Sequence, residues 1–278
     1  MPALHSGSGA RLTLRFAKYQ ALGNDYLVVE PEDVGTLTPE RVRRLCDRHF
    51  GVGADGVLVP TAPPAAADFA LAIWNPDGSE AEKSGNGLRI FARWLWDRGR
   101  VAGEPFTVAT AGGRVRCQVR DAGACIFVEM GRARFGAVDE TLDLPGGSIR
   151  FTAVDVGNPH CVVRCDAPSP ELARRLGPQL ETHPRFPKRT NVQLVRVCGR
   201  DRIQIEIWER GAGYTLASGS SSCAAAAAAV KWSACDGAVT VEMPGGTLAI
   251  GVGPAFELTM EGPAEKVFEG EISLPRLR

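Results

Sequence analysis

The sequence predicts an α+β protein of two homologous halves, in each of which a mixed β-sheet curls like a barrel around one central helix. The first observation is a repeat, because the small-residue loop at Ser84 recurs 134 residues later at Ser218. Trp74 and Trp208 stand at the same offset. The second observation is that each half has many short strand-like segments but one helical segment that is apolar on nearly every side. Such a helix is buried.

Two further pairs of landmarks follow the same order along the chain. Gly23-Asn24 matches Gly157-Asn158 at the offset of 134, and Gly112-Gly113 matches Gly245-Gly246 at 133. Coincidence among the 32 glycines explains a single match but not a shared offset. We therefore predict an internal duplication. Residues 13–131 and about 264–278 form the N-terminal half, and residues 132–263 form the C-terminal half.

The elements of the first half follow from apolar patterning and from turn residues. Gly23 breaks residues 12–30 into a strand pair, and Thr38 with the proline after it marks the start of a helix over 39–48. The remaining apolar segments predict strands at 57–59, 70–74, 106–118 and 125–130, and the central helix at 88–96.

The second half repeats this plan. Strands are predicted at 151–156, 190–195, 203–208, 239–250 and 256–260, and a short helix at 170–176. The central helix covers the alanines after Cys223, and a helix of alanine needs walls that approach very closely.

Residues 51–56 match the Gly-x-Gly-x-x-Gly pattern of dinucleotide-binding proteins. That motif follows a strand and opens a helix, whereas this segment follows a helix and opens a strand. We therefore predict a turn here and no dinucleotide site.

Composition and charge are those of an ordinary globular protein. Of the 278 residues, 44% are hydrophobic and 23% are charged, and Lys+Arg equals Asp+Glu at 32 each. This balance gives no electrostatic case for nucleic acid or an anionic membrane as a partner. Residues 1–13 lack the apolar region of a secretory signal, and no apolar run approaches the ~20 residues that span a bilayer. We expect a cytoplasmic protein, and a homodimer is compatible with the sequence.

The eight cysteines give no sign of a metal site. None lies in Cys-x-x-Cys or has the spacing of a zinc ligand set. His160-Cys161 with Cys165 comes nearest, but that run is apolar and strand-like. Buried thiols and no metal are expected.

The two repeated loops have the chemistry of anion cradles. Ser84-Gly85-Asn86 and Ser218-Gly219-Ser220 each open a predicted helix, where N–H groups lack partners and the macrodipole adds positive charge. Small residues let a carboxylate approach closely. Two such cradles facing each other would hold a small carboxylate with one hydroxyl on each face, which is the geometry of a two-base racemase or epimerase.

The ordered set of motifs resembles diaminopimelate epimerase from about residue 16 to the end of the chain. The matching segments are Gly23-Asn24-Asp25-Tyr26, residues 46–55, Asn75-Pro-Asp-Gly-Ser, Ser84-Gly-Asn-Gly, Gly157-Asn-Pro-His160, Thr190-Asn191-Val, Glu209-Arg210-Gly and Ser218-Gly with Cys223-Ala-Ala.

This resemblance implies a fold of two similar domains and an isomerase that needs neither pyridoxal phosphate nor another cofactor. It implies epimerisation of LL- to meso-diaminopimelate, a step of lysine biosynthesis, at the carbon alpha to a carboxylate. By position, the residues implied at the reacting centre are Ser84, Ser218, His160 and Glu209. Those implied in substrate binding are Asn24, Asn75, Gly85, Asn86, Asn158, Asn191, Arg210, Gly219 and Ser220.

The chain departs from the family at the chemistry itself, because serines occupy both positions, 84 and 218, where the family has its catalytic cysteines. Gly56, Lys83 and Tyr214 stand where the family usually has Gln, Met and Glu. A thiol of pKa ~8.5 is tuned easily towards neutrality, whereas a serine hydroxyl needs an adjacent general base. Natural divergence is preferred to engineered replacement, since eight other cysteines remain and neighbouring residues differ too.

Two other functions stay open. One is a divergent paralogue that isomerises or dehydrates another small carboxylate with a more acidic proton. The other is a non-catalytic protein that keeps the anion-holding site.

Structural roles also compete with the functional ones. The two serines could be N-caps, the asparagines turn formers, His160 a core histidine and Glu209-Arg210 a solvated ion pair. A Lys83–Ser84 pair is disfavoured, because sequence neighbours rarely point the same way.

Overall fold

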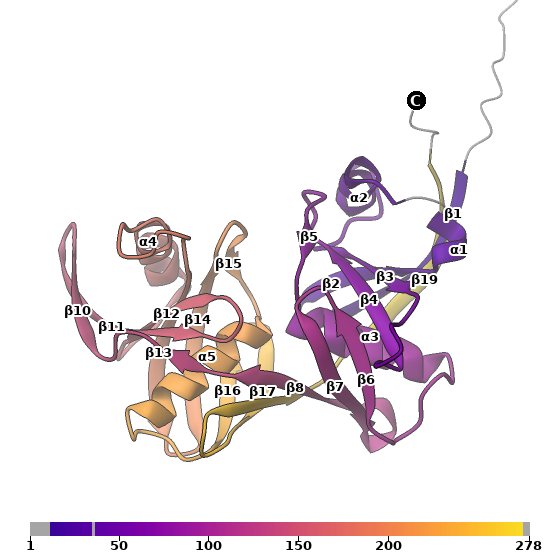
Figure 1. Ribbon diagram of the computed structural model, residues 1–278. Helices are drawn as coiled ribbons and strands as arrows, with labels where there is room; N and C mark the ends of the chain where they lie inside the picture. The colour runs from indigo at the N-terminus through magenta and orange to yellow at the C-terminus, as the bar shows by residue number, and fades with distance from the viewer. Residues whose placement is uncertain (1–11, 35–36, 275–278) are drawn as a thin grey trace, which may run out of the picture.

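Alternating apolar residues form strands throughout the described part of the chain, and these strands join into one 19-stranded sheet that runs through two lobes (Figure 1). The computed structural model describes residues 12–34 and 37–274. The strands of the first lobe are β1 (Leu12–Ala21), β2 (Asn24–Val29), β3 (Val57–Thr61), β4 (Phe69–Trp74), β5 (Glu80–Ala81), β6 (Phe106–Thr110), β7 (Gly113–Arg120) and β8 (Cys125–Arg132). Those that follow are β9 (Arg134–Phe135), β10 (Glu140–Leu144), β11 (Gly147–Asp155), β12 (Pro159–Arg164), β13 (Asn191–Gly199), β14 (Arg202–Glu209), β15 (Gly213–Thr215), β16 (Ala238–Met243), β17 (Gly246–Val252), β18 (Glu257–Gly262) and β19 (Glu265–Leu274).

The helices are α1 (Pro31–Val34), α2 (Pro39–Cys46), α3 (Gly85–Asp97), a 3₁₀ turn η1 (Asp121–Gly123), α4 (Pro170–Glu181) and α5 (Gly219–Lys231). Four of the helices, α2 with α4 and α3 with α5, lie at equivalent places in the two halves. Helix α2 connects the parallel pair β2–β3, and α4 connects the parallel pair β12–β13. Helices α3 and α5 each connect a second parallel pair, β4–β6 and β14–β16.

This shared topology confirms the predicted α+β fold of two homologous halves, each with a sheet around one helix. Trp74 ends β4, and Trp208 lies next to the end of β14. Ser84 and Ser218 are the N-cap residues of α3 and α5, and both helices have 13 residues.

The cores of the two halves are packed differently around these helices. Helix α3 buries large side chains, among them Leu88, Phe91 and Trp94. Each such side chain contributes about 1.5–3 kcal/mol by leaving water. Helix α5 instead buries a run of alanines, residues 224–229, all of them fully inaccessible. The sheet of the second half therefore reaches the helix backbone much more closely.

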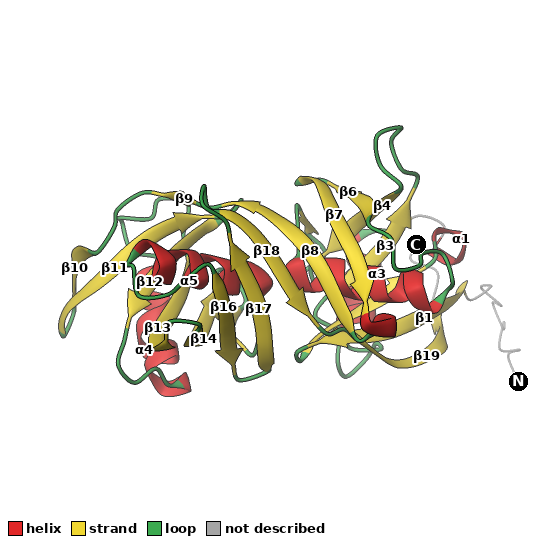
Figure 2. Cartoon of the chain, turned by 90° about the horizontal axis from the view of Figure 1, so that it is seen from below, coloured by secondary structure: helices red, strands yellow, loops and turns green. Residues whose placement is uncertain are grey.

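Two strand pairings connect the halves. Strand β8 pairs antiparallel with β18, with Val128 opposite Met260. Strand β19 returns to the first half and pairs antiparallel with β1, with Phe16 opposite Gly270. Helices α3 and α5 lie end to end along the long axis, and β8 and β18 run across the junction between them (Figure 2). The division of the chain at residues 131 and 264 stays a prediction. Residues 275–278, which were assigned to the N-terminal half, lie outside the described part of the chain.

Several boundaries differ from the prediction. The helix predicted at 39–48 ends at Cys46, because the Asp47 carboxylate accepts hydrogen bonds from the amides of His49 and Phe50. Helix α4 continues beyond residue 176 through Pro178. Its Gly177 packs directly on the Trp208 ring, and this tertiary contact outweighs the local break signal. The turn predicted at residues 51–56 lies between α2 and β3.

Within residues 12–34 and 37–274, no helix is long and apolar enough to cross a bilayer. The predicted absence of a secretory signal concerns residues 1–13, and residues 1–11 lie outside the described part of the chain.

Candidate active site

The N-termini of α3 and α5 meet between the two halves. A Cβ atom placed on Gly85 would lie 3.3 Å from the Cα of Gly219, so the two backbones are in contact where neither residue has a side chain. The same Cβ atom would lie 3.1 Å from Met260 Cε and 3.2 Å from Met130 Cε, so two thioether side chains also pack at this junction. The two predicted loops therefore lie against each other, and two helix N-termini with partial positive charge come together there.

The first amides of both helices remain available at this junction. Ser84 Oγ accepts a hydrogen bond from the Gly87 amide at 3.0 Å, and Ser218 Oγ accepts one from the Ser221 amide at 3.4 Å. In the part of the chain that the structure describes, no protein acceptor is found for the amides of residues 85, 86, 219 and 220. Those four N–H groups are the ones that a carboxylate would use at helix N-termini.

Ser84 has a tyrosine as its neighbour. Tyr26, on β2, places its Oη 3.3 Å from Ser84 Oγ and is 7% exposed. Burial raises the pKa of Tyr26 to about 12, the hydrogen bond to Ser84 opposes that rise, and the charge of Glu209 adds to it. Sequence reasoning included Tyr26 in a motif but not among the site residues, although the offset of 134 makes it the equivalent of His160.

Ser218 has a carboxylate as its neighbour. Glu209, the last residue of β14, is partly buried, and burial raises its pKa above the usual value. A hydrogen bond with the Ser218 side chain opposes this rise, and the charge of Asp55 adds to it. The Ser220 hydroxyl lies 3.5 Å from Ser218 Oγ. Because Asp55 and Tyr26 belong to the first half and Glu209 to the second, these groups converge between the halves.

His160 is buried behind Asn158 and does not take part in a serine pair. Its Nε2 lies 2.9 Å from Asn158 Oδ1, and its Nδ1 lies 3.0 Å from Gln193 Nε2. The same Gln193 nitrogen also donates to Ser221 Oγ at 2.9 Å. Burial lowers the pKa of His160 to about 3, so the ring is neutral. Sequence reasoning missed Gln193, which connects α5 to His160 across the parallel pair β12–β13.

Asn24 and Asn86 form one network at the start of α3. Asn86 Nδ2 donates to Asn24 Oδ1 (2.9 Å) and to the Ala217 carbonyl (3.3 Å) of the other half. Asn24 Nδ2 donates to Asp55 Oδ2 at 2.9 Å, and buried Arg89 donates to Asn86 Oδ1 at 2.9 Å. These carboxamides are thus fixed by partners from both halves.

Asn191 and Arg210 lie together, whereas Asn75 belongs to its own turn. Asn191 Oδ1 accepts from the backbone amide of Arg210 at 3.0 Å, and its Nδ2 donates to the Pro159 carbonyl at 3.0 Å. The exposed Arg210 guanidinium donates to the Lys188 carbonyl at 3.1 Å. Asn75 Nδ2 donates to Ser79 Oγ at 3.0 Å. The turn-forming reading of Asn75 therefore has a structural basis.

Lys83 forms its hydrogen bond with the backbone of Met130 at the junction and not with Ser84. Its Nζ donates to the Met130 carbonyl at 2.9 Å, and burial lowers its pKa. The expectation of buried thiols holds for Cys223 and four others, but Cys198 is exposed and Cys125 and Cys165 are half-buried. No cluster of three or more His, Cys, Asp or Glu side chains suited to a metal occurs among the described residues.

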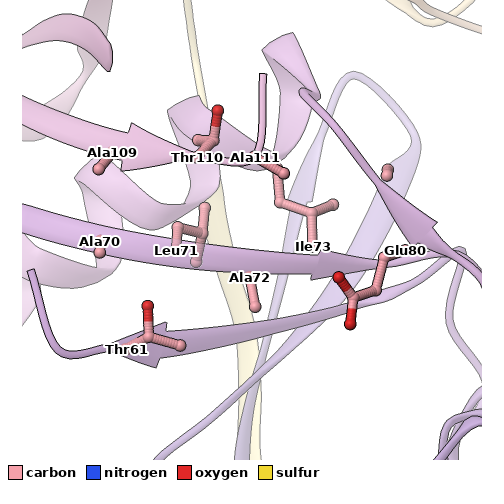
Figure 3. Close-up of a pocket in the computed structure, with 10 residues that line it drawn as sticks. Thr61, Ala70, Leu71, Ala72, Ile73, Glu80, Ala109, Thr110 and Ala111 are labelled. Atoms are coloured by element: carbon pink, nitrogen blue, oxygen red, sulfur yellow. The ribbon is translucent and has the colours of Figure 1, made fainter. Parts of the chain in front are cut away.

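A cavity of about 200 Å³ lies elsewhere in the first half, where β4 changes its neighbour from β6 to β5 (Figure 3). Small apolar side chains line it, together with Thr61, Glu80 and Thr110. None of the predicted site residues borders it.

Comparison with known proteins gives a consistent result. The diaminopimelate epimerase family model matches residues 16–136 and 152–267. A protein named diaminopimelate epimerase 2 from Nostoc sp. is 50% identical over 273 residues, covering 94% of this chain and 96% of the relative. A diaminopimelate epimerase from Pseudomonas syringae is 39% identical over 277 residues, covering 95% of this chain and all (100%) of the relative.

The same fold occurs in a solved structure of low sequence identity. A hydroxyproline epimerase from Agrobacterium vitis with bound trans-4-hydroxy-L-proline superposes with a TM-score of 0.73 at 17% identity, covering 95% of this chain and 93% of that one. The two segments matched by the family model and the relatives that align almost end to end show that the chain belongs to the diaminopimelate epimerase family of isomerases.

Proposed function

We propose that this chain is a cofactor-independent isomerase that removes and returns the hydrogen on a carbon next to a carboxylate. The observation that carries this proposal is the contact between the starts of α3 and α5, at Gly85 and Gly219, with a serine hydroxyl on each. Each hydroxyl has its own ionisable neighbour, Tyr26 or Glu209. A substrate held there has one hydroxyl on each face of its α-carbon.

The helix ends supply the electrostatic part of the reaction. When the α-hydrogen leaves as a proton, its bonding electrons spread onto the substrate carboxylate. The amides of residues 85, 86, 219 and 220 donate to that carboxylate, and both helix dipoles favour the added negative charge. Because the donors are fixed before the reaction, little reorganisation is needed as the charge develops.

Diaminopimelate is the candidate substrate, and the LL- to meso- conversion in lysine biosynthesis is the candidate role. The names of the Nostoc and Pseudomonas relatives support this substrate. A serine hydroxyl is a much weaker acid than a thiol, so we expect the unmodified chain to act only slowly on diaminopimelate. A divergent activity on another small carboxylate remains the alternative within enzymes.

A non-catalytic, anion-binding role is the second candidate, and one observation favours it. Both serine oxygens accept an amide hydrogen bond from their own helix, as ordinary N-caps do. A binding protein would gain thermal stability from the ligand without exchanging its α-hydrogen.

The test compares four proteins: the unmodified chain, Ser84→Cys, Ser218→Cys and the double variant. Acid–base catalysis by a placed group is worth ~10²–10⁴-fold, so the double variant should epimerise LL-diaminopimelate at least ~10²-fold faster than the unmodified chain. Each single variant should gain much less, because the reaction needs both an acid and a base. The measurements are α-hydrogen exchange in D₂O and epimerisation.

Ser148→Cys is the matched control, because Ser148 is exposed on β11 and a thiol there should change nothing. Fast turnover by the unmodified chain would show that the hydroxyls suffice. Stabilisation by diaminopimelate without exchange in all four proteins would favour the binding role, and no gain in the double variant would point to another substrate.

A further inference from the structure

We propose that Tyr26 is a positioning residue that makes Ser84 the proton donor of the site, whereas Ser218, beside Glu209, is the proton acceptor. This inference rests on the proposed isomerase function and gives its two hydroxyls different roles. The assignment comes from the side chains that lie next to each serine.

Ser84 Oγ lies between an amide that donates to it and a phenol hydroxyl that can donate to it. The Gly87 amide donates at 3.0 Å, and the Tyr26 hydroxyl, at 3.3 Å, has Ser84 Oγ as its hydrogen-bond partner. When the tyrosine donates, Ser84 Oγ accepts two hydrogen bonds and keeps its own proton for a third group. A hydroxyl whose oxygen accepts hydrogen bonds gives up its proton more readily, because those donors stabilise the alkoxide. Ser84 is therefore arranged to release a proton.

Ser218 is arranged in the opposite sense. Its Oγ accepts from the Ser221 amide at 3.4 Å, and its other close partner is the Ser220 hydroxyl at 3.5 Å. Glu209 is near enough for Ser218 to affect its pKa, and an ionised carboxylate has only acceptor atoms, so the proton it can take from this pair is that of Ser218. With its proton directed to Glu209, Ser218 Oγ presents lone pairs to a substrate. The pair has the arrangement of a nucleophile or base activated by a neighbouring general base.

The position of the Tyr26 ring is fixed by the fold. A Cβ on Gly56 would lie 2.5 Å from Tyr26 Cε1 and 2.5 Å from the Trp74 carbonyl oxygen, so the ring fills space that only glycine leaves open. Strand β2 pairs with β1 on one side and with β3 on the other, which holds the residue in register. Tyr26 has little freedom to turn away from Ser84.

In one turnover every proton that leaves a group is taken up by another. The α-C–H bond breaks, its electron pair stays on the substrate, and the proton moves to Ser218 Oγ as the Ser218 proton moves to Glu209. On the other face the Ser84 O–H bond breaks and its proton joins the α-carbon, while the Tyr26 proton moves to Ser84 Oγ. Glu209 has gained a proton and Tyr26 has lost one, and exchange with water restores both.

The first experiment tests the contact without any substrate. The chain has three tyrosines, so labelling with ¹³C at Cζ gives three resonances that Tyr→Phe variants assign. Ser84→Ala should shift the Tyr26 resonance, and Ser218→Ala should leave it in place. A Tyr26 resonance that ignores Ser84→Ala would overturn the proposal.

The second experiment measures α-hydrogen exchange and epimerisation of LL- and meso-diaminopimelate in D₂O with Tyr26→Phe. For the isomer whose α-hydrogen faces Ser218, removal of the proton continues but delivery from Ser84 slows. The ratio of exchange to epimerisation should then rise about ten-fold, the value of one hydrogen bond. For the other isomer, exchange and epimerisation should fall together and their ratio should stay constant.

Tyr19→Phe is the matched control, because Tyr19 is also buried but donates to Asp97 at 2.9 Å, away from the site. It should leave both ratios unchanged. Equal loss of exchange and epimerisation for both isomers in Tyr26→Phe would reduce Tyr26 to a structural role and overturn the proposal. Absence of exchange in the unmodified chain would overturn its action on diaminopimelate and the donor role proposed for that reaction, and the labelled Tyr26 resonance would still report the contact.

Discussion

The start of α3 and the start of α5 have the same backbone and different side chains around it. At one pair of equivalent positions the first half has Tyr26 and the second has His160, and at another it has Asn75 and Glu209. Tyr26 touches its serine, whereas His160 is turned to Asn158 and Gln193. The two halves therefore share a helix start with a serine N-cap but differ in the side chains next to that serine.

The helices themselves show the same contrast. Arg89 of α3 corresponds to Cys223 of α5, and both are fully buried. The Arg89 guanidinium donates to Asn86 Oδ1 and to the Pro263 carbonyl, and burial lowers its pKa to about 10, so it stays charged at neutral pH. The Cys223 thiol has its pKa raised to about 12 by burial and stays neutral. The first half thus adds a positive charge behind the junction that the second half lacks.

The largest expected effect comes from Glu209→Gln, which removes the acceptor next to Ser218 and leaves a neutral side chain, as at Asn75 in the first half. We expect α-hydrogen exchange to fall by ~10²–10⁴-fold, the value of a general base. Glu206→Gln is the matched control, since Glu206 is buried on the same strand but accepts from Tyr214 at 2.8 Å. Equal losses in the two variants would mean that β14 has a structural role only.

A smaller effect is expected on the pH dependence of the free energy of unfolding, to which His160 should contribute and Tyr26 should not. The folded pKa of His160 is about 3 and the unfolded value is about 6.5, so between these pH values the unfolded chain binds the extra proton. The free energy of unfolding is therefore intact above about pH 6.5 and falls by up to about 1.4 kcal/mol per unit as pH drops below it.

Urea unfolding of the chain and of His160→Gln from pH 7 to pH 5 measures this slope. In His160→Gln the free energy of unfolding should no longer show the decrease that protonation of His160 causes. Tyr26→Phe should still show that decrease. A slope that His160→Gln does not change would show that the ring is not the titrating group.

The smallest expected effect concerns the two serines as caps. Ser84→Ala removes the oxygen that accepts from the Gly87 amide at 3.0 Å. Ser218→Ala removes the oxygen that accepts from the Ser221 amide at 3.4 Å. Loss of an N-cap costs about 1 kcal/mol, so Ser84→Ala should lower the free energy of unfolding by about that amount and Ser218→Ala by less. Thermal and urea unfolding measure both values, and a larger loss at Ser218 would reverse the order.

Much of the fold was predictable because its signals are local or repeated. The N-cap serines, the apolar helix around Trp94 and the offset of 134 residues each specify structure without knowledge of distant contacts. Helix α4 was predicted too short because Gly177 is fixed by its contact with Trp208, which is distant in the sequence.

The candidate site was predictable to a lesser degree. The loops at Ser84 and Ser218 follow from motif and helix chemistry. The partners Tyr26 and Gln193 do not, because they reach the site through strand pairing. Tyr26 lies 58 residues from Ser84, and Gln193 reaches His160 only through the parallel register of β12 and β13. No local pattern in the sequence encodes such a register.

The antiparallel pairing of β8 with β18 has a consequence for how this molecule arose. These are the last strands of the two equivalent meanders, and antiparallel pairing of equivalent strands is what a two-fold homodimer of half-length chains would form. In such an ancestor every position facing the junction would occur twice in identical form, and a tyrosine on one side would require a tyrosine on the other. Fusion of two gene copies would remove that constraint. Mutation would then be free to give the two faces of one site different side chains.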